Sequence, residues 1–419
     1  MNVPEKSVST SGALVAATKD KNVQQIVVSG RLPDAPSVRL SPGQALRGAD
    51  NSATITFVND ADGVQLSSDN RIDGLRLEAA PDKRAVFNDT TVASLGRIEL
   101  RNLTATGRVQ ILARDKVRGG HVDIDGLDIV AADARGESER PHGYGVSVLQ
   151  GAFTLWNMQA DDSVIVTADL VGISAGRDSA PVRGSGVFVS GAGDKGGRLN
   201  ISRLETGPIY SDGGIAPGTS DQITGGVFTV YGSHVDVVKN HGPVTTYGVN
   251  DMVLDNWGVV DLWIAEAKIT SRGPSGIGFV NFGTLHDLKV TAPIETFGQG
   301  ARGFNVYSGT VDMADFDRVV TRADGAVGIQ ISQPIGRLIV RRGIETFGGT
   351  GQSLVKGVVM ALSAIGLSIK PGGSVREIEI AGGIKTNGPG IAPFENHGAI
   401  ETIHVAGGLV AAGGGFDKI

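Results

Sequence analysis

The sequence contains no cysteine, which excludes disulfide bonds, thiolate nucleophiles, iron–sulfur clusters and cysteine-based zinc sites. Aromatic residues are also scarce, at 5% of the 419 residues. The longest apolar stretch, residues 357–369, is shorter than the roughly 20 residues that span a bilayer. The chain does contain 62 glycines, about twice the usual share of roughly 7%, without a collagen-like period. We therefore expect a soluble, globular, glycine-rich protein.

Positive charge is never concentrated along the chain, and the formal net charge is -6. We therefore expect neither nucleic acid nor a membrane surface as a partner. The first 25 residues lack the pattern of a secretory signal, so we expect a cytoplasmic protein or an exported one whose leader has been removed.

Several sequence motifs of well-known enzyme classes are missing. There is no His-x-x-x-His, no P-loop and no dinucleotide-binding glycine pattern between a strand and a helix, which removes support for metalloprotease, NTPase and dehydrogenase chemistry. We predict no cofactor. Acidic loops leave Ca²⁺ open as a weak alternative.

A repeat of about 25 residues is the main positive signal. Residues 285–298 and 335–348 both end in Ile-Glu-Thr-Phe-Gly, and residues 375–388 end in Ile-Lys-Thr-Asn-Gly. Aligning the repeats gives columns of equivalent positions. One column is almost purely apolar: Ile98, Val122, Phe153, Leu199, Val238, Trp263, Leu288, Ala314, Leu338, Ile378 and Ile403. The column two residues later is apolar as well, apart from Asn240: Leu100, Ile124, Leu155, Ile201, Asn240, Ala265, Val290, Phe316, Val340, Ile380 and Val405.

Further columns complete each repeat. An apolar column contains Val244, Ile269, Ile294, Val320, Ile344, Ile384 and Leu409. A Thr/Ser column follows, and then a glycine column that we expect to turn a corner: Gly248, Gly273, Gly298, Gly348, Gly388 and Gly413. Alternating apolar positions with glycine corners predict short strands. The sequence therefore predicts an all-β fold, a single-domain parallel β-helix of roughly a dozen three-stranded coils.

Two polar features are expected to belong to this scaffold. Asn240 stands in an apolar column, which predicts a polar group in the interior or a distorted coil. Asn396-His397-Gly398 recurs as Asn256-Trp257-Gly258 and Asn281-Phe282-Gly283, which predicts a ladder of turns rather than a site.

The first 50 residues add a resemblance to a known superfamily. A helix-compatible segment at residues 9–20 precedes a strand at residues 25–29 and a Leu-x-Pro-Gly-x-x-Leu-x-Gly-Ala turn at residues 40–49. This entry resembles that of right-handed β-helix proteins of the pectate-lyase-like superfamily. The resemblance implies a right-handed coil with an N-terminal capping helix. It says little about chemistry, because the superfamily includes lyases, hydrolases, epimerases, phage spikes and adhesins. We place the capping region at residues 1–48 and the coils at residues 49–419.

Departures from the period predict loops. Three long loops are expected near residues 132–145, 174–184 and 210–222, where a site would be built on the rigid coils. An apolar insert at residues 349–364 is expected to pack on the coils or on a neighbouring subunit, which leaves a homotrimer open.

The candidate site residues are polar positions that flank the apolar columns and so face outward. Asp123 and Asp125 are two apart on one strand, which predicts carboxylates about 6 to 7 Å apart, a spacing nearer to inverting than to retaining glycosidases. His241 and Glu266 are expected to hydrogen-bond across neighbouring coils as a proton-transfer pair. We assign these four residues as catalytic candidates. The substrate-binding candidates are Trp156, as an exposed stacking platform, with Arg177, Tyr210, Asp212, Asp221 and Lys239.

The leading hypothesis is a carbohydrate-active enzyme that cleaves or rearranges glycosidic bonds of an oligo- or polysaccharide by carboxylate acid/base chemistry. One alternative is a polysaccharide lyase acting on a uronate glycan, with His241 or Lys239 as the base. Another is a non-catalytic, glycan-binding or structural β-helix.

Overall fold

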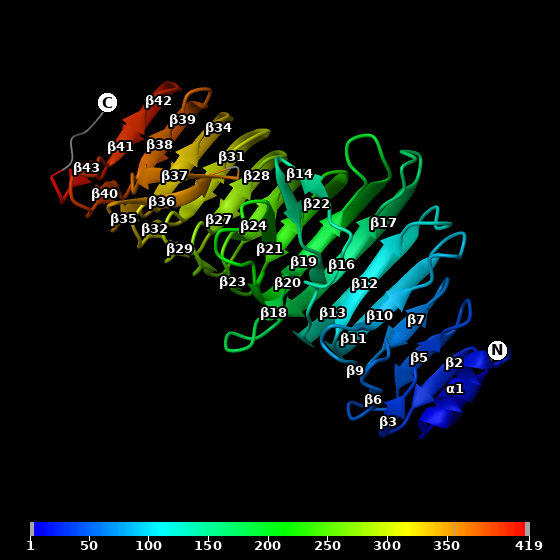
Figure 1. The fold of residues 1–419 in the computed structure, drawn as a ribbon. Coiled ribbons are helices and arrows are strands. Elements are labelled where there is room, and N and C mark those ends of the chain that lie inside the picture. Colours follow the sequence, from blue (N-terminus) through cyan, green and yellow to red (C-terminus); the bar gives the residue numbers. More distant parts are fainter. Residues whose placement is uncertain (1–3, 356, 415–419) are drawn as a thin grey trace. The chain divides into compact units, whose positions relative to one another are not determined.

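The computed structural model describes residues 4–355 and 357–414. It shows an all-β chain of parallel β-helix type, which confirms the predicted fold class (Figure 1). No helix among these residues is long and apolar enough to cross a membrane. The chain forms two compact units. The first comprises residues 1–136, 150–207 and 231–234, and the second comprises residues 137–149, 208–230 and 235–419.

The first unit begins with β1 (Glu5–Val8) and the helix α1 (Ser11–Lys19). The Thr10 side chain accepts a hydrogen bond from the Ala13 backbone N–H at 3.2 Å, which caps the helix as Ser/Thr residues before a helix commonly do. Leu14 and Ala17 are buried. The predicted N-terminal helix is therefore present, and it packs against β1 to β4.

Parallel strands form three sides of the first unit. The first side contains β2 (Gln25–Val28), β5 (Ala45–Gly48), β8 (Arg71–Asp73), β11 (Arg97–Thr106), β13 (Gly120–Ala131) and β17 (Ile165–Ala175). The second side contains β3 (Arg31–Ala35), β6 (Thr54–Phe57) and β9 (Arg76–Glu78), which pairs with the end of β11. The third side contains β4 (Val38–Arg39), β7 (Val64–Leu66), β10 (Arg84–Asn88), β12 (Arg108–Ala113), β16 (Gly151–Asn157) and β19 (Ser185–Ser190). The short β18 (Val182–Arg183) completes the unit.

The second unit repeats this three-sided plan with more regular coils. Its first side contains β25 (Val259–Ala265), β28 (Thr284–Val290), β31 (Thr310–Phe316), β34 (Pro334–Val340), β39 (Ser374–Ile380) and β42 (Ala399–Val405). Its second side contains β23 (Val244–Thr246), β26 (Ile269–Ser271), β29 (Ile294–Thr296), β32 (Val319–Thr321), β35 (Ile344–Thr346), β40 (Ile384–Thr386) and β43 (Leu409–Ala411). Its third side contains β21 (Gln222–Thr229), β24 (Asp251–Asn256), β27 (Ile277–Asn281), β30 (Arg302–Val306), β33 (Val327–Ile331), β38 (Leu367–Ile369) and β41 (Phe394–Asn396). Two strands, β20 (Arg198–Asp212) and β22 (Ser233–Asn240), contain residues of both units.

The apolar columns line the interior of the second unit as predicted, except in the last coil, where Ile403 is exposed. Leu288 pairs with Trp263 on one side and Ala314 on the other, and all three are fully buried. Stacked strands lie about 4.8 Å apart, so equivalent side chains of successive coils pack directly on each other. One column needs a shift of one residue, because Val319 rather than Val320 pairs with Ile294.

Two members of the predicted columns were placed on the wrong side of the first unit. Phe153 and Leu155 belong to β16 on the third side, whereas Ala168 and Leu170 of β17 follow Val122 and Ile124 on the first side. Residues 131–165 contain an additional strand-forming segment, so counting along the sequence selected the wrong strand.

The predicted polar interior group at Asn240 and the predicted turn ladder are both present, but Phe282 of the ladder also lines a hollow of the candidate site described below. Asn240 is buried and accepts a hydrogen bond from the Trp263 indole N–H at 2.9 Å. In the turn ladder, the Asn256 amide donates to Asn281 Oδ1 at 2.8 Å. A buried amide with satisfied partners is compatible with a β-helix interior.

The glycine column exists for a different reason than the one predicted. Its members avoid the left-handed region of positive φ, and a methyl group on Gly273 would overlap the carbonyl oxygen of Gly248 in the preceding coil. Gly298 stands in the same relation to Gly273. Close stacking of successive coils, rather than a special backbone turn, therefore requires glycine here.

The insert at residues 349–364 forms an antiparallel hairpin of β36 (Thr350–Val355) and β37 (Val358–Ser363). The Ser353 hydroxyl donates to the Gly300 carbonyl oxygen at 2.7 Å and accepts from the buried Arg302 guanidinium at 3.0 Å. The Leu354 N–H donates to Ser275 Oγ at 3.0 Å. The hairpin thus packs on the coils through β36, which was one of the two alternatives predicted for this insert.

Candidate functional site

Lys239, His241 and Glu266 meet on the outer surface of the second unit. Glu266 Oε2 lies 2.9 Å from His241 Nδ1, and its Oε1 lies 2.9 Å from Lys239 Nζ. The hydrogen bonds from Lys239 and then His241 lower the pKa of Glu266. Glu266 is therefore ionised at neutral pH, a state suited to accepting a proton rather than to donating one. The expected hydrogen bond between His241 and Glu266 is present.

Asp123 and Asp125 lie on β13 in the first unit. The Asp123 carboxylate forms an ion pair with Arg97 and lies 3.0 Å from His121 Nε2, with the side chain 15% exposed. Asp125 is exposed and pairs in the sheet with Arg101. Asp123 is thus already bound to two basic groups. Its catalytic assignment stays a prediction.

Trp156 does not form the predicted exposed platform. It lies on β16, on the third side of the first unit, and is 7% exposed. Its indole N–H donates to the Gly191 carbonyl oxygen at 3.0 Å, and its ring packs edge-on against Phe188. Trp156 still alternates with the interior residue Leu155 as predicted, but contacts with Gly191 and Phe188 cover it, so Trp156 has a structural environment.

The remaining binding candidates have local partners. Arg177 holds Asp128 through two hydrogen bonds, at 2.9 and 2.7 Å. Tyr210 and Asp212 lie at the end of strand β20 instead of on a loop, because the strand continues three residues into the predicted loop. Asp221 is on the loop, and its backbone carbonyl accepts from the Ser147 N–H at 2.8 Å.

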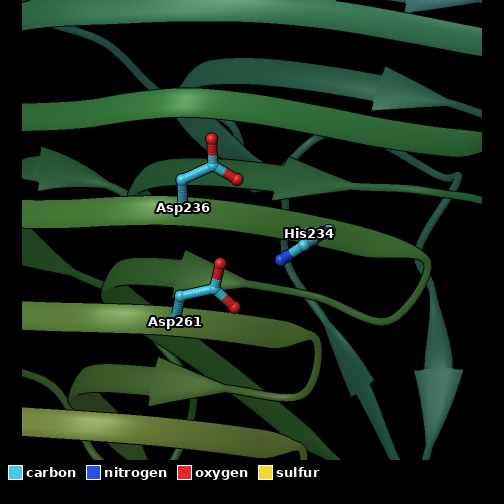
Figure 2. Close-up of side chains that lie close together, drawn as sticks. All are labelled: His234, Asp236 and Asp261. Carbon is cyan, nitrogen blue, oxygen red and sulfur yellow. The ribbon is translucent and has the colours of Figure 1, made fainter.

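A small acidic group lies on the first side of the second unit. Asp236 of β22 and Asp261 of β25 present carboxylates on the same surface, and His234 lies two residues before Asp236 on its strand (Figure 2). Exposed acidic groups of this kind are common without a bound ion, and nothing further marks this one as a cation site.

The strongest candidate site lies on the outer surface of the third side of the second unit. One row of paired positions there runs Phe228, Asp255, Val280, Asn305, Gln330, Ser368 and Glu395. Five of its side chains are polar and buried, those of Asp255, Asn305, Gln330, Ser368 and Glu395. Among the described residues, the amide nitrogen and oxygen of Asn305 and the amide oxygen of Gln330 have no hydrogen-bond partner. The carboxyl oxygens of Asp255 have no partner of good hydrogen-bond geometry, and the Trp257 indole is the donor beside them. Buried polar groups without partners are rare in folded proteins and point to a missing ligand or water.

Aromatic rings line the same surface. Trp257, Phe282 and Tyr307 follow the third-side strands in successive coils, and neighbouring rings in this ladder have centroids 5.6 and 5.2 Å apart. Tyr144 packs on them from a separate hairpin, 4.5 Å from Phe282 and 5.0 Å from Trp257 between ring centroids. Its hydroxyl donates to the Phe282 carbonyl oxygen at 3.2 Å.

The hairpin that carries Tyr144 has an unusual turn. It consists of β14 (His142–Gly143) and β15 (Val146–Val148), joined through Tyr144 and Gly145. Both turn residues have positive φ, 53° and 84°, as in a type I′ turn, which normally has Asn or Gly at the first position. A tyrosine with positive φ is strained, and such strain is concentrated at functional sites.

Three hollows follow one another along β36. The "amide hollow", of about 400 Å³, is lined by residues that include Thr219, Asn250, Ser275, Gln299, Gln352 and Ser353. The "aromatic hollow", of about 50 Å³, is lined by residues that include Tyr144, Met252, Asp255, Phe282 and Tyr307. The third, of about 350 Å³, is lined by residues that include Tyr307, Gln330, Ser332 and Lys370. Neighbouring hollows share walls, since Asn250, Ser275 and Leu354 line the first two and Tyr307 lines the last two.

Asp255 differs from the other acidic residues of this region. Its side chain is fully buried, and burial raises its pKa well above the ordinary value, although the neighbouring Trp257 indole lowers it in part. Asp251, four residues earlier, is also buried, but it accepts hydrogen bonds from Gly213, Gly248 and Thr224. Asp251 thus has a structural role, whereas Asp255 faces a hollow and has the Trp257 indole as its neighbouring donor.

This site was not predicted from the sequence. A signal was present, because the position after the apolar residues Leu254, Phe279, Phe304 and Ile329 reads Asp255, Val280, Asn305 and Gln330. That column would have suggested an outward, solvated surface. Only the hairpins folded over it reveal that these side chains are buried.

Comparison of the chain with protein-family models, with curated proteins and with solved structures finds no match.

Proposed function

We propose that the second unit binds an oligosaccharide in the three hollows along β36. The observation that carries this proposal is their continuity, with amide and hydroxyl groups lining one end and aromatic rings lining the next. Sugars present hydroxyl groups at their edges and C–H groups on their faces, so amides and aromatic faces together match both surfaces. The first and third hollows, of about 400 and 350 Å³, have the size of a typical ligand pocket, which ranges from about 300 to 1,000 Å³, and the aromatic hollow between them, of about 50 Å³, has room for a single small group.

Binding is better supported than hydrolysis at this place. Glycoside hydrolysis generally uses two carboxyl groups on opposite sides of the bond. Among the described residues lining the three hollows, Asp255 is the one carboxyl group. Its raised pKa would suit a general acid, but no second carboxylate accompanies it there.

A glycan panel tests the proposal. The full chain is titrated with neutral, uronate and amino oligosaccharides, and binding is measured by calorimetry. Gln299 and Gln352 are exposed residues of the amide hollow, so replacing both with alanine leaves the fold intact and is expected to weaken binding by about tenfold. The exposed Gln24→Ala variant of the first unit is the matched control. The proposal is wrong if no saccharide binds, or if the double variant binds as well as the original protein.

A second candidate function is polysaccharide lyase chemistry on a uronate glycan, at Lys239, His241 and Glu266. The observation in its favour is Glu266 bridging an imidazole and an ammonium group on an exposed surface. His241, held by the carboxylate, would remove the proton next to the uronate carboxyl group, and Lys239 would balance the negative charge. The resemblance of the N-terminal region to the pectate-lyase-like superfamily also supports this candidate, although a fold alone does not assign chemistry.

The lyase candidate has its own test. Lyase products contain an unsaturated uronate that absorbs ultraviolet light, so turnover on uronate glycans is followed directly. Glu266→Gln keeps the shape of the side chain and is expected to reduce turnover at least a hundredfold. The absence of ultraviolet-absorbing products across the uronate glycans would exclude the candidate, without bearing on saccharide binding along β36.

A further inference from the structure

We propose that the saccharide bound along β36 contains an amino sugar, whose ammonium group enters the aromatic hollow and pairs with the Asp255 carboxylate. This inference rests on the proposed saccharide binding and names the sugar class. It starts from the one carboxyl group among the described residues that line the hollow, which has no counter-ion there and the Trp257 indole as its neighbouring donor.

Asp255 is placed as a recognition group. It is fully buried at the last position but one of strand β24, and its neighbours in the sheet are the apolar residues Phe228 and Val280. A buried carboxylate without a counter-ion is costly, and proteins normally pair such a group or leave it neutral. The neighbouring Trp257 indole is a neutral donor and supplies no positive charge. A cationic ligand would supply that charge.

The walls of the aromatic hollow suit a cation. Tyr144, Phe282 and Tyr307 line it, and the faces of aromatic rings attract ammonium groups within about 6 Å of the ring centre. The described residues that line this hollow include no lysine, arginine or histidine. A bound ammonium group would thus meet one carboxyl group and several rings, with no basic side chain among those residues to repel it.

The backbone at Tyr144 is an independent indication of a ligand. Its positive φ is unfavourable for tyrosine, and Asn or Gly would fit the turn better. The ring nevertheless lies on Phe282 at the edge of the hollow and remains 44% exposed. The strained position makes sense if the exposed ring face contacts a ligand.

The empty and bound states would differ in protonation. Burial favours the neutral acid when the hollow is empty. A bound ammonium group would favour the carboxylate, because an opposite charge nearby stabilises the ionised form. Neutral sugars offer no such gain, so the inference predicts selectivity between sugars of the same shape.

Matched sugar pairs test the inference. Glucosamine is compared with glucose, galactosamine with galactose, and the trisaccharide of β-1,4-linked glucosamine with cellotriose and with its N-acetylated form. Calorimetry is carried out on the full chain at about pH 6, where the sugar amines are largely protonated. We expect the amino form of the preferred sugar to bind at least tenfold more tightly than its neutral counterparts.

The variant Asp255→Asn keeps the size of the side chain and removes its charge. It is expected to abolish the preference for the amino sugar while leaving affinity for the neutral sugar within about twofold. Asp261→Asn, on the first side of the same unit, is the control and should keep the preference. If Asp255→Asn fails to fold, competition between tetramethylammonium and the amino sugar on the unaltered protein replaces it, and competition is expected.

The outcomes separate the two proposals. The inference is wrong, and saccharide binding stands, if sugars bind in the hollows without any preference for the amino forms. The same holds if Asp255→Asn keeps the preference, or if tetramethylammonium does not compete with the amino sugar. If no sugar of either kind binds, both are wrong.

Discussion

The Trp263 indole N–H donates a hydrogen bond to Asn240 Oδ1, 2.9 Å away, inside the second unit. Both side chains are buried, and the ring of Phe279 packs edge-on against the indole with centroids 5.0 Å apart. Asn240 interrupts an apolar column because the largest residue of the neighbouring column carries a donor that needs an acceptor.

Asn240→Ala is therefore expected to destabilise the protein. It leaves the indole N–H without its acceptor and opens a small cavity, which together cost about 2 to 4 kcal/mol. Urea unfolding followed by tryptophan fluorescence measures the change. Asn200→Ala, at an exposed position in the first unit, is the control and should change stability by less than about 0.5 kcal/mol. Equal effects of the two substitutions would contradict a structural role for this hydrogen bond.

Asp251 is expected to make stability depend on pH. Burial raises its pKa to about 6, so the folded protein retains a proton that the unfolded chain releases near the ordinary pKa of about 4. Stability should fall as pH rises from about 4 to about 6, by about 3 kcal/mol from this group, and then level off. Unfolding by urea at several pH values measures this slope.

Asp251→Asn is the informative variant for that slope. Its amide oxygen can accept the Gly213 and Gly248 N–H groups, and its NH₂ group can donate to Thr224 after the hydroxyl rotates. The variant should fold and lose the contribution of Asp251 to the slope, whereas Asp261→Asn should retain it. An unchanged pH profile in Asp251→Asn would show that another group is responsible.

Gly298→Ala should be strongly destabilising. A methyl group there would overlap the Gly273 carbonyl oxygen, and backbone atoms of a stacked coil cannot move aside independently. We expect a loss of about 3 kcal/mol or more. Gly136→Ala is the matched control, since a methyl group there meets no atom within 4 Å. Thermal unfolding of the two variants compares them, and a mild effect of Gly298→Ala would mean that the coils can separate locally.

Tyr144→Asn should weaken saccharide binding without changing the stability of the protein. Asparagine suits the first position of a type I′ turn, so relief of about 1 kcal/mol of backbone strain offsets the lost ring contacts with Trp257 and Phe282. The midpoint of unfolding should change little, whereas saccharide affinity should fall at least tenfold. Tyr144→Phe keeps the ring and is expected to bind nearly normally. Unaltered binding by Tyr144→Asn would remove this residue from the site.

The sequence predicted the interior better than the surface. Residues such as Leu288 and Val290 recur with a constant period where the coils are regular, and stacking forces equivalent positions to pack on each other. Trp156 was misplaced because the period breaks between residues 131 and 165, where the chain inserts extra residues. A column alignment cannot tell which strand resumes after such an insertion.

The amino-acid sequence by itself determined the all-β class, the coiled repeat, the buried Asn240, the asparagine turn ladder and the meeting of His241 with Glu266. All of these follow from a local period that stacking reproduces in three dimensions. The tertiary structure alone decided the environment of Asp255, Asn305 and Gln330. Two hairpins from distant parts of the sequence, at residues 142–148 and 350–363, fold over an outward-facing row and remove it from water. Burial by remote segments leaves no periodic mark at the positions that it covers.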